Sequence, residues 1–287
     1  MIPDRETRRE IAVRMQTASE RMRLPFRGRV WRGSGGAWQG AGAGSSIDFQ
    51  DHRAYLPGDD PRHIDWAAYA RSGNYTMKLY REEVSPSVDV LLDVSESMFV
   101  APEKARRVFE LFHFSLESAR RGGAALHCHL LRGDESAPWA IDAALGFGDW
   151  SALPWRKTGA SLPWRQGSLR VVISDLLFPG SPTSLLTSLS SARGIGLIFS
   201  PFSQTESDPD WAGNIEFADC ETGIRRSQRV TPSLLSAYRA AWRRHFALWE
   251  EGCRLHRVVL ARVGDEHDFL ESLRRDAVPR GAVELSG

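Results

Sequence analysis

From Ser87 onward, short apolar runs alternate with segments of helical periodicity, and this alternation restricts the possible folds more than any other feature of the chain. The apolar runs cover residues 88–93, 125–131, 169–175, 195–200 and 257–263. Near-continuous apolar strands separated by helices are typical of a parallel sheet that is buried on both faces. We therefore predict an α/β fold with a Rossmann-type, mainly parallel sheet and helices on both faces.

Residues 105–119 and 185–192 show the apolar spacing of helices that pack on such a sheet. A long helix is predicted to start at Thr231-Pro232, because Thr caps free amides and Pro fits the first helical position. Near the N-terminus, residues 5–23 are strongly charged but carry one narrow apolar stripe, which predicts a further helix.

The segment ahead of the sheet reads differently. Residues 28–46 are rich in Gly and Ser, which predicts a loop or hairpin. Asp60-Pro61 predicts the start of a short helix that runs through Trp66 and Ala70, with Trp66 in the core. Residues 75–83 alternate as a half-buried strand does. We expect two parts, an N-terminal extension over 1–84 and the α/β domain over 85–287.

The composition is that of an ordinary soluble protein, with 42% apolar and 25% charged residues and a net charge of +1 among 287 residues. The chain has no signal-peptide pattern, no apolar run of membrane-spanning length, and three Cys without C-x-x-C spacing. We expect a cytoplasmic protein with no membrane span and no nucleic-acid partner. A basic face formed by arginines between 225 and 244 is the alternative, but these are more simply the solvated side of the long helix.

The sharpest local motif is Asp93-x-Ser95-x-Ser97, which begins at the last residue of the first apolar run. A second carboxylate, Asp175, ends another predicted strand in the same way. Ligands of open parallel sheets bind at the carboxyl ends of the strands, and hard oxygen donors suit Mg²⁺, Mn²⁺ or Ca²⁺. The motif therefore predicts a metal site, while the alternative is that Asp93 and Ser95 only cap the next helix.

A third loop could add a hydroxyl ligand to this site. It contains Thr158 and Ser161, and the sequence leaves open which of them it would be, with Thr158 taken as the candidate. A metal-dependent hydrolase built on Asp93, Asp175 and Asp219 is a further alternative, which would need these carboxylates to converge in one cleft.

Two patterns resemble known families. Asp93-x-Ser95-x-Ser97, with a later Thr and Asp, resembles the metal-ion-dependent adhesion site (MIDAS) of von Willebrand factor A domains. A run upstream closely resembles the hallmark of the bacterial domain-of-unknown-function 58 (DUF58) family. It comprises Asp51, Arg53, Tyr55, Pro57, Gly58, Asp59, Asp60, Arg62, Ile64, Asp65, Trp66, Ala70 and Arg71. The similarity continues through the strand that ends in Asp93, through Ile173-Ser174-Asp175, and through Asp219-x-Glu221-x-Gly223.

The resemblance implies a von Willebrand factor A-like domain that binds a divalent metal through Asp93, Ser95, Ser97, Thr158 and Asp175. It implies a non-enzymatic adaptor whose metal engages an acidic residue of a partner, which for this family would be a MoxR-type AAA+ ATPase. The hallmark itself also has a structural interpretation: Arg62 and Arg71 could pair with Asp59 or Asp65 and hold the extension to the sheet.

Overall fold

The computed structural model of the chain divides into two compact units. It describes residues 2–26, 38–43, 49–84, 86–145, 150–151, 153–157, 162, 164–178 and 180–286. Unit 1 comprises residues 1–26 and 87–287, and unit 2 comprises residues 27–86. The N-terminal helix thus folds with the sheet and not with the segment that follows it in sequence.

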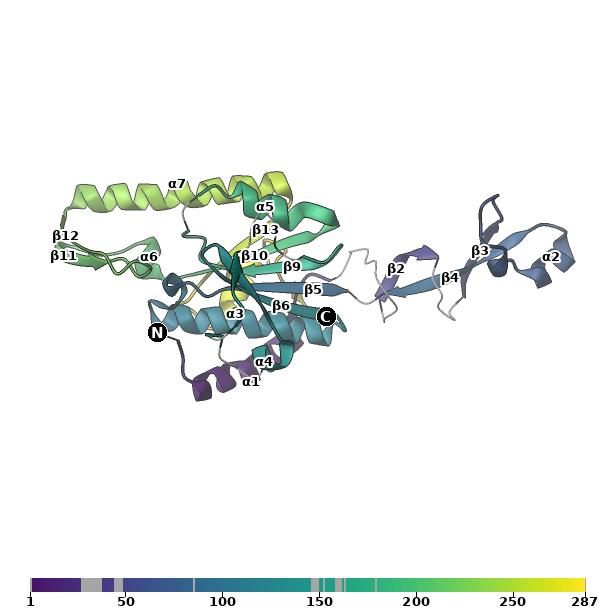
Figure 1. Ribbon diagram of the computed structural model, residues 1–287, viewed down its shortest axis with the longest axis horizontal. Helices are drawn as coiled ribbons and strands as arrows, with labels where there is room; N and C mark the ends of the chain where they lie inside the picture. The colour runs from purple at the N-terminus through teal and green to yellow at the C-terminus, as the bar shows by residue number, and fades with distance from the viewer. Residues whose placement is uncertain are drawn as a thin grey trace. The chain divides into compact units, whose positions relative to one another are not determined.

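Unit 1 is built on a seven-stranded sheet (Figure 1). Its strands are β5 (Ser87–Asp93), β6 (Ala125–Arg132), β7 (Glu135–Trp139), β8 (Arg156–Lys157), β9 (Leu169–Ile173), β10 (Ile195–Phe202) and β13 (Val259–Gly264). The order is β13-β10-β9-β5-β6-β7-β8, and every pairing is parallel except those of β7 with its two neighbours. Without β8, this is the Rossmann-type order 3-2-1-4-5-6. The predicted mainly parallel α/β sheet is confirmed.

Helices cover both faces of this sheet (Figure 1). One face carries α3 (Pro102–Arg121), with α1 (Arg5–Arg21) and α4 (Ile141–Leu145) on the same side, and the other carries α5 (Thr183–Ser190) and α7 (Pro232–His256). The shorter helical segments are η2 (Glu96–Phe99), η3 (Ser191–Arg193), α6 (Gln204–Ser207), α8 (Phe269–Ser272) and η4 (Leu273–Ala277). In the described part of the chain, no helix combines the length and the apolar character needed to cross a membrane.

The helix α3 is buried almost along its whole length. One side of it packs on the sheet, and α1 covers another side with its buried residues Ile11, Met15 and Ala18. The chain after α1 is held by β1 (Met22–Arg23), which pairs with β14 (Glu284–Leu285) at the far end of the sequence. These contacts explain why the narrow apolar stripe of the N-terminal helix is sufficient to order it.

Unit 2 contains a three-stranded antiparallel sheet in the order β2-β4-β3. Its elements are β2 (Trp38–Ala43), β3 (Phe49–Ala54), η1 (Pro61–His63), α2 (Trp66–Ser72) and β4 (Thr76–Val84). The prediction of one helix from Asp60 to Ala70 is wrong, because the chain straightens at Ile64 and starts a new helix. Asp65 caps that helix by accepting hydrogen bonds from the amides of Ala67 and Ala68, each at 3.0 Å.

Three acidic residues of the hallmark are hydrogen-bonded to Arg or His side chains within unit 2. Asp59 pairs with Arg53 through two contacts of 2.7 Å, and Asp65 pairs with His52 at 2.8 Å. The sequence suggested Asp59 or Asp65 as the partner of Arg62, but Arg62 pairs with Asp60. Trp66 was expected in the core, but 59% of its surface is exposed.

A hairpin between α6 and α7 was not predicted. It consists of β11 (Gly213–Ala218) and β12 (Arg225–Val230). Arg225, Arg226 and Arg229 therefore lie on a strand, and the prediction that they line the long helix is wrong. Both strands are largely exposed: β11 has only two half-buried apolar residues, Ile215 and Phe217, and β12 lacks the apolar alternation by which strands are recognised.

We expect the packing of α1 on α3 to contribute to the stability of unit 1. Met15→Ala should lower the free energy of unfolding by about 2–4 kcal/mol, because Met15 is 1% exposed and truncation leaves a cavity against α3. Val13→Ala in the same helix, where the side chain is 63% exposed, should change it by less than about 0.5 kcal/mol. Urea unfolding of both variants measures the difference, and equal effects would contradict this packing.

Candidate functional site

The predicted metal residues lie where the strand order of the sheet reverses. The adjacent strands β5 and β9 occupy its centre, and the chain leaves them toward opposite faces, through α3 and α5 respectively (Figure 1). Loops that diverge in this way leave a crevice at the carboxyl ends of the strands, which is the usual ligand site of such sheets. Asp93 is the last residue of β5, and Ser174 and Asp175 directly follow β9.

Asp93 is a buried carboxylate with no basic side chain bonded to it in the described part of the chain. Its Oδ2 accepts a hydrogen bond from the Ser174 hydroxyl at 2.7 Å, and its Oδ1 accepts one from the Ser95 amide at 3.0 Å. Burial raises the pKa of Asp93 from 3.8 to about 6, and the nearby Asp175 adds to this rise. The ionised carboxylate is therefore short of positive charge, which a bound cation would supply.

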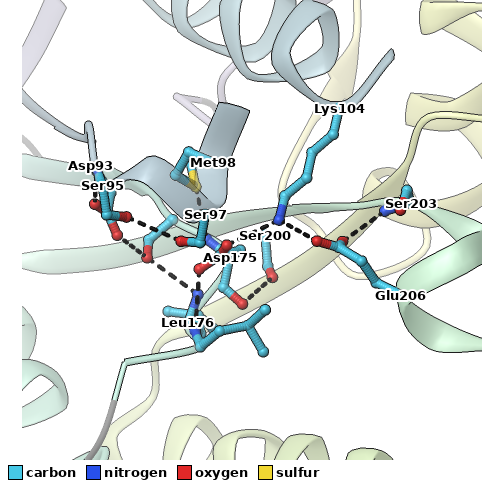
Figure 2. A network of polar contacts seen from close by, with 12 residues as sticks. Asp93, Ser95, Ser97, Met98, Lys104, Asp175, Leu176, Ser200, Ser203 and Glu206 are labelled. Atoms are coloured by element: carbon cyan, nitrogen blue, oxygen red, sulfur yellow. Dashed lines mark hydrogen bonds and ion pairs between the residues drawn. The ribbon is translucent and has the colours of Figure 1, made fainter. Parts of the chain in front are cut away.

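The hydroxyls of Ser95 and Ser97 lie side by side next to Asp93 (Figure 2). The start of the short segment η2 brings them together, with 3.2 Å between the two Oγ atoms. Two ligands at neighbouring corners of an octahedron about 2.1 Å from Mg²⁺ would be separated by about 3.0 Å. The two serines thus have the spacing of one edge of a Mg²⁺ shell, with Asp93 behind them.

Asp175 has a different environment, because its charge is already paired. Its Oδ2 accepts a hydrogen bond from Lys104 Nζ at 2.9 Å (Figure 2). Its Oδ1 accepts one from the Leu177 amide at 3.1 Å. Lys104 is fully buried and also contacts Glu206 at 2.6 Å. Burial opposes the charge of Lys104, but Asp175 and Glu206 outweigh burial and raise the pKa of Lys104. The ammonium group therefore remains charged inside the protein.

The donors present fit a divalent cation on the Asp93 side of the site. Asp93, Ser95 and Ser97 offer one under-neutralised carboxylate and two correctly spaced hydroxyls. Asp175 faces the same region but is neutralised by Lys104, which reduces its attraction for a second cation. The two candidates for the third loop, Thr158 and Ser161, lie outside the described residues.

Sequence reasoning missed Lys104 and Glu206, although both left signals. Lys104 lies on the apolar face of its helix, four residues before Val108 and seven before Leu111. Glu206 closes a capping box with Ser203, which holds α6 and aims the carboxylate at the ammonium group. A lysine on a buried stripe signals a buried partner, but the sequence does not show which carboxylate that partner is.

Glu221 was named only within the Asp219-x-Glu221-x-Gly223 stretch of the resemblance, and not as a site residue. It belongs to the turn of the β11–β12 hairpin, and its Oε1 accepts a hydrogen bond from the Ser97 amide at 3.0 Å. In the same turn, Asp219 Oδ1 accepts hydrogen bonds from the amides of Glu221 and Thr222, each at 2.9 Å. The described residues contain no group of three or more His, Cys, Asp or Glu side chains placed to hold a metal, so Asp93, Asp175 and Asp219 do not form one.

One comparison with known proteins gives a match. Residues 51–127 match the model of the family described as Protein of unknown function DUF58. The matched segment includes the hallmark in unit 2 and, in unit 1, β5, the Asp93–Ser97 motif and α3. This match supports the resemblance to the DUF58 family. Neither the curated proteins nor the solved structures give a significant match.

The buried carboxylate makes stability depend on pH in a defined direction. Because the pKa of Asp93 is about 6 in the folded chain and 3.8 as its ordinary value, the folded chain keeps this proton at pH 5 while the unfolded chain has released it. The contribution of Asp93 to the free energy of unfolding is therefore complete below pH 4. It falls by at most about 3 kcal/mol as the pH rises to 6, and stays low above that.

Asp93→Asn, which cannot ionise, should remove this fall when both proteins are unfolded with denaturant at pH 4 to 7 in EDTA. Asp134→Asn, in an exposed turn, serves as the control and should behave as the wild type. If the free energy of unfolding changed with pH in the same way in the wild type and in Asp93→Asn, the raised pKa of Asp93 would be contradicted.

Proposed function

We propose that the chain is a non-enzymatic, von Willebrand factor A-like module that binds a divalent cation at Asp93, Ser95 and Ser97 and, through it, an acidic side chain of a protein partner. The observation that carries this proposal is the pair of serine hydroxyls, 3.2 Å apart beside a buried Asp93 with a raised pKa. The Rossmann-type strand order with an antiparallel β7 and the position of the motif at its switch point support the same assignment.

The chemistry of the ligands favours binding over catalysis. Hydroxyl ligands carry no charge, so an ion held by Ser95 and Ser97 keeps most of its own charge. Mg²⁺ usually retains several waters, and a carboxylate from outside can replace one of them. The attraction then depends on the metal and on an acidic partner residue together. Thr158 or Ser161 would add a further hydroxyl ligand. Asp175 would lie beside the ion while its own charge stays paired with Lys104.

The resemblance to the DUF58 family suggests the partner, a MoxR-type AAA+ ATPase, with the chain acting as its adaptor in the cytoplasm. The adaptor role is a proposal that rests on this resemblance. The metal site gives it a mechanism, because an acidic residue on the ATPase would be the ligand that the module recognises.

The metal proposal is tested by calorimetric titration with Mg²⁺ and Mn²⁺. We expect the wild type to bind one ion, and we expect Ser95→Ala/Ser97→Ala to lower the affinity at least about tenfold, because two ligands are lost. Glu96→Gln is the matched control, since Glu96 stands between the serines with an exposed side chain. A wild type that is folded but binds neither ion would overturn the proposal.

The partner proposal is tested with a purified MoxR-type ATPase from the same genome on a biosensor surface. We expect binding in Mg²⁺ that is lost in EDTA and lost with Asp93→Ala. Circular dichroism at each condition verifies that the variant is folded. Equal binding in Mg²⁺ and EDTA would show that recognition does not use the metal.

A further inference from the structure

The turn of the β11–β12 hairpin lies against the candidate metal site. The hairpin follows α6 and leads to the start of α7, and its turn carries Glu221 to the Ser97 amide, 124 residues away in sequence. This hydrogen bond places the turn at the Ser97 side of the site.

The conformation of the turn is fixed locally. The side chain of Asp219 binds two amides of the turn, as described above, while its backbone N–H donates to the Ile224 carbonyl at 2.9 Å. The Gly223 amide donates to the Asp219 carbonyl at 2.8 Å, and Gly223 has a φ of 70°, which favours glycine. These bonds set the direction in which Glu221 leaves the turn, independently of the contact with Ser97.

Aromatic packing holds β11 against α7. Trp211, two residues before β11, packs against Phe217 of β11 and against Tyr238 of α7, with ring centroids 5.1 and 5.3 Å apart. The strands themselves are largely exposed and pair only with each other among the described strands. Segments with exposed hydrogen bonds and few buried contacts open at low free energy, so the turn can leave Ser97 without unfolding the seven-stranded sheet.

The contact of Glu221 with the site is well suited to replacement. Oε1 accepts one hydrogen bond from Ser97, and among the described residues Oε2 has no hydrogen-bond partner. A single exposed hydrogen bond to a carboxylate changes an equilibrium by about tenfold. The contact is thus strong enough to bias the hairpin and weak enough for an outside ligand to displace it.

We propose that Glu221 occupies the position of the partner's acidic residue, so that the hairpin closes the site of the isolated protein until a partner carboxylate replaces it. This inference rests on the proposed function, because it assigns a regulator to the same metal site. Glu221 would supply the carboxylate next to Ser95 and Ser97 when the ion is bound, and the ligand that displaces it would be another carboxylate, from an acidic segment of a protein.

The contact itself is tested without metal by hydrogen exchange of the Ser97 amide, followed by NMR. We expect Glu221→Ala to accelerate this exchange several-fold, because the acceptor is removed. Glu216→Ala is the matched control, since Glu216 lies on the same hairpin and pairs with Arg225. Equal exchange in Glu221→Ala and wild type would overturn the inference.

Its role is tested by titrating Mn²⁺ into wild type, Glu221→Ala and Glu216→Ala at constant ionic strength, with acetate or chloride present. We expect Glu221→Ala to bind Mn²⁺ about tenfold more weakly in chloride, because one anionic ligand is lost. Acetate should raise the Mn²⁺ affinity of Glu221→Ala at least about threefold over its value in chloride. It should leave the Mn²⁺ affinities of the wild type and Glu216→Ala unchanged.

The outcomes separate the two proposals. If Ser95→Ala/Ser97→Ala removes Mn²⁺ binding but Glu221→Ala binds Mn²⁺ as the wild type does and ignores acetate, the metal site stands and the closing role of Glu221 is refuted. If the folded wild type binds no Mn²⁺, the metal proposal and the inference built on it both fail.

Discussion

The carboxyl edge of the sheet depends on one buried ammonium group, that of Lys104. It joins three elements that are distant in sequence: α3, the loop after β9 and α6. Removing a charge from water is costly, and two carboxylates within 3 Å offset that cost here. Because Asp175 is held by this ion pair, the preceding Ser174 can donate its hydroxyl to Asp93 at 2.7 Å. The geometry on the Asp93 side therefore follows from the charge pairing on the Asp175 side.

The two carboxylates at this edge look equivalent in the sequence, yet they differ in charge balance. Each follows or ends a central strand, and each is buried. Asp175 faces an internal cation, whereas Asp93 accepts hydrogen bonds from a hydroxyl and an amide among the described residues, and burial raises its pKa to about 6. The apolar runs locate both residues at strand ends. They cannot show that Lys104, 71 residues from Asp175, neutralises Asp175 and not Asp93.

A structural feature can be predicted from the sequence when the residues that determine it are close together in the chain. The five parallel strands follow from continuous apolar runs, and α7 follows from its cap and stripe, because these signals are local. The hairpin β11–β12 was not predicted because few of its side chains are buried. Trp66 was misplaced because the sequence does not state how small unit 2 is, and a small unit cannot enclose every aromatic side chain. The pairs Lys104–Glu206 and Ser97–Glu221 depend on contacts over about a hundred residues.

Charge balance also limits what can bind at the site. Asp93 and Asp175 lie at the site, Glu221 reaches it through the Ser97 amide, and Glu206 is linked to it through Lys104. Among the described residues, these four carboxylates and Lys104 together have a charge of −3 when all are ionised. A divalent cation would bring this to −1 and lower the pKa of Asp93. In the proposed exchange, a partner carboxylate takes the place of Glu221 and the charge near the ion does not change. Net charge then cannot decide between the internal and the external ligand, so the choice depends on the contacts that the rest of the partner makes around the site.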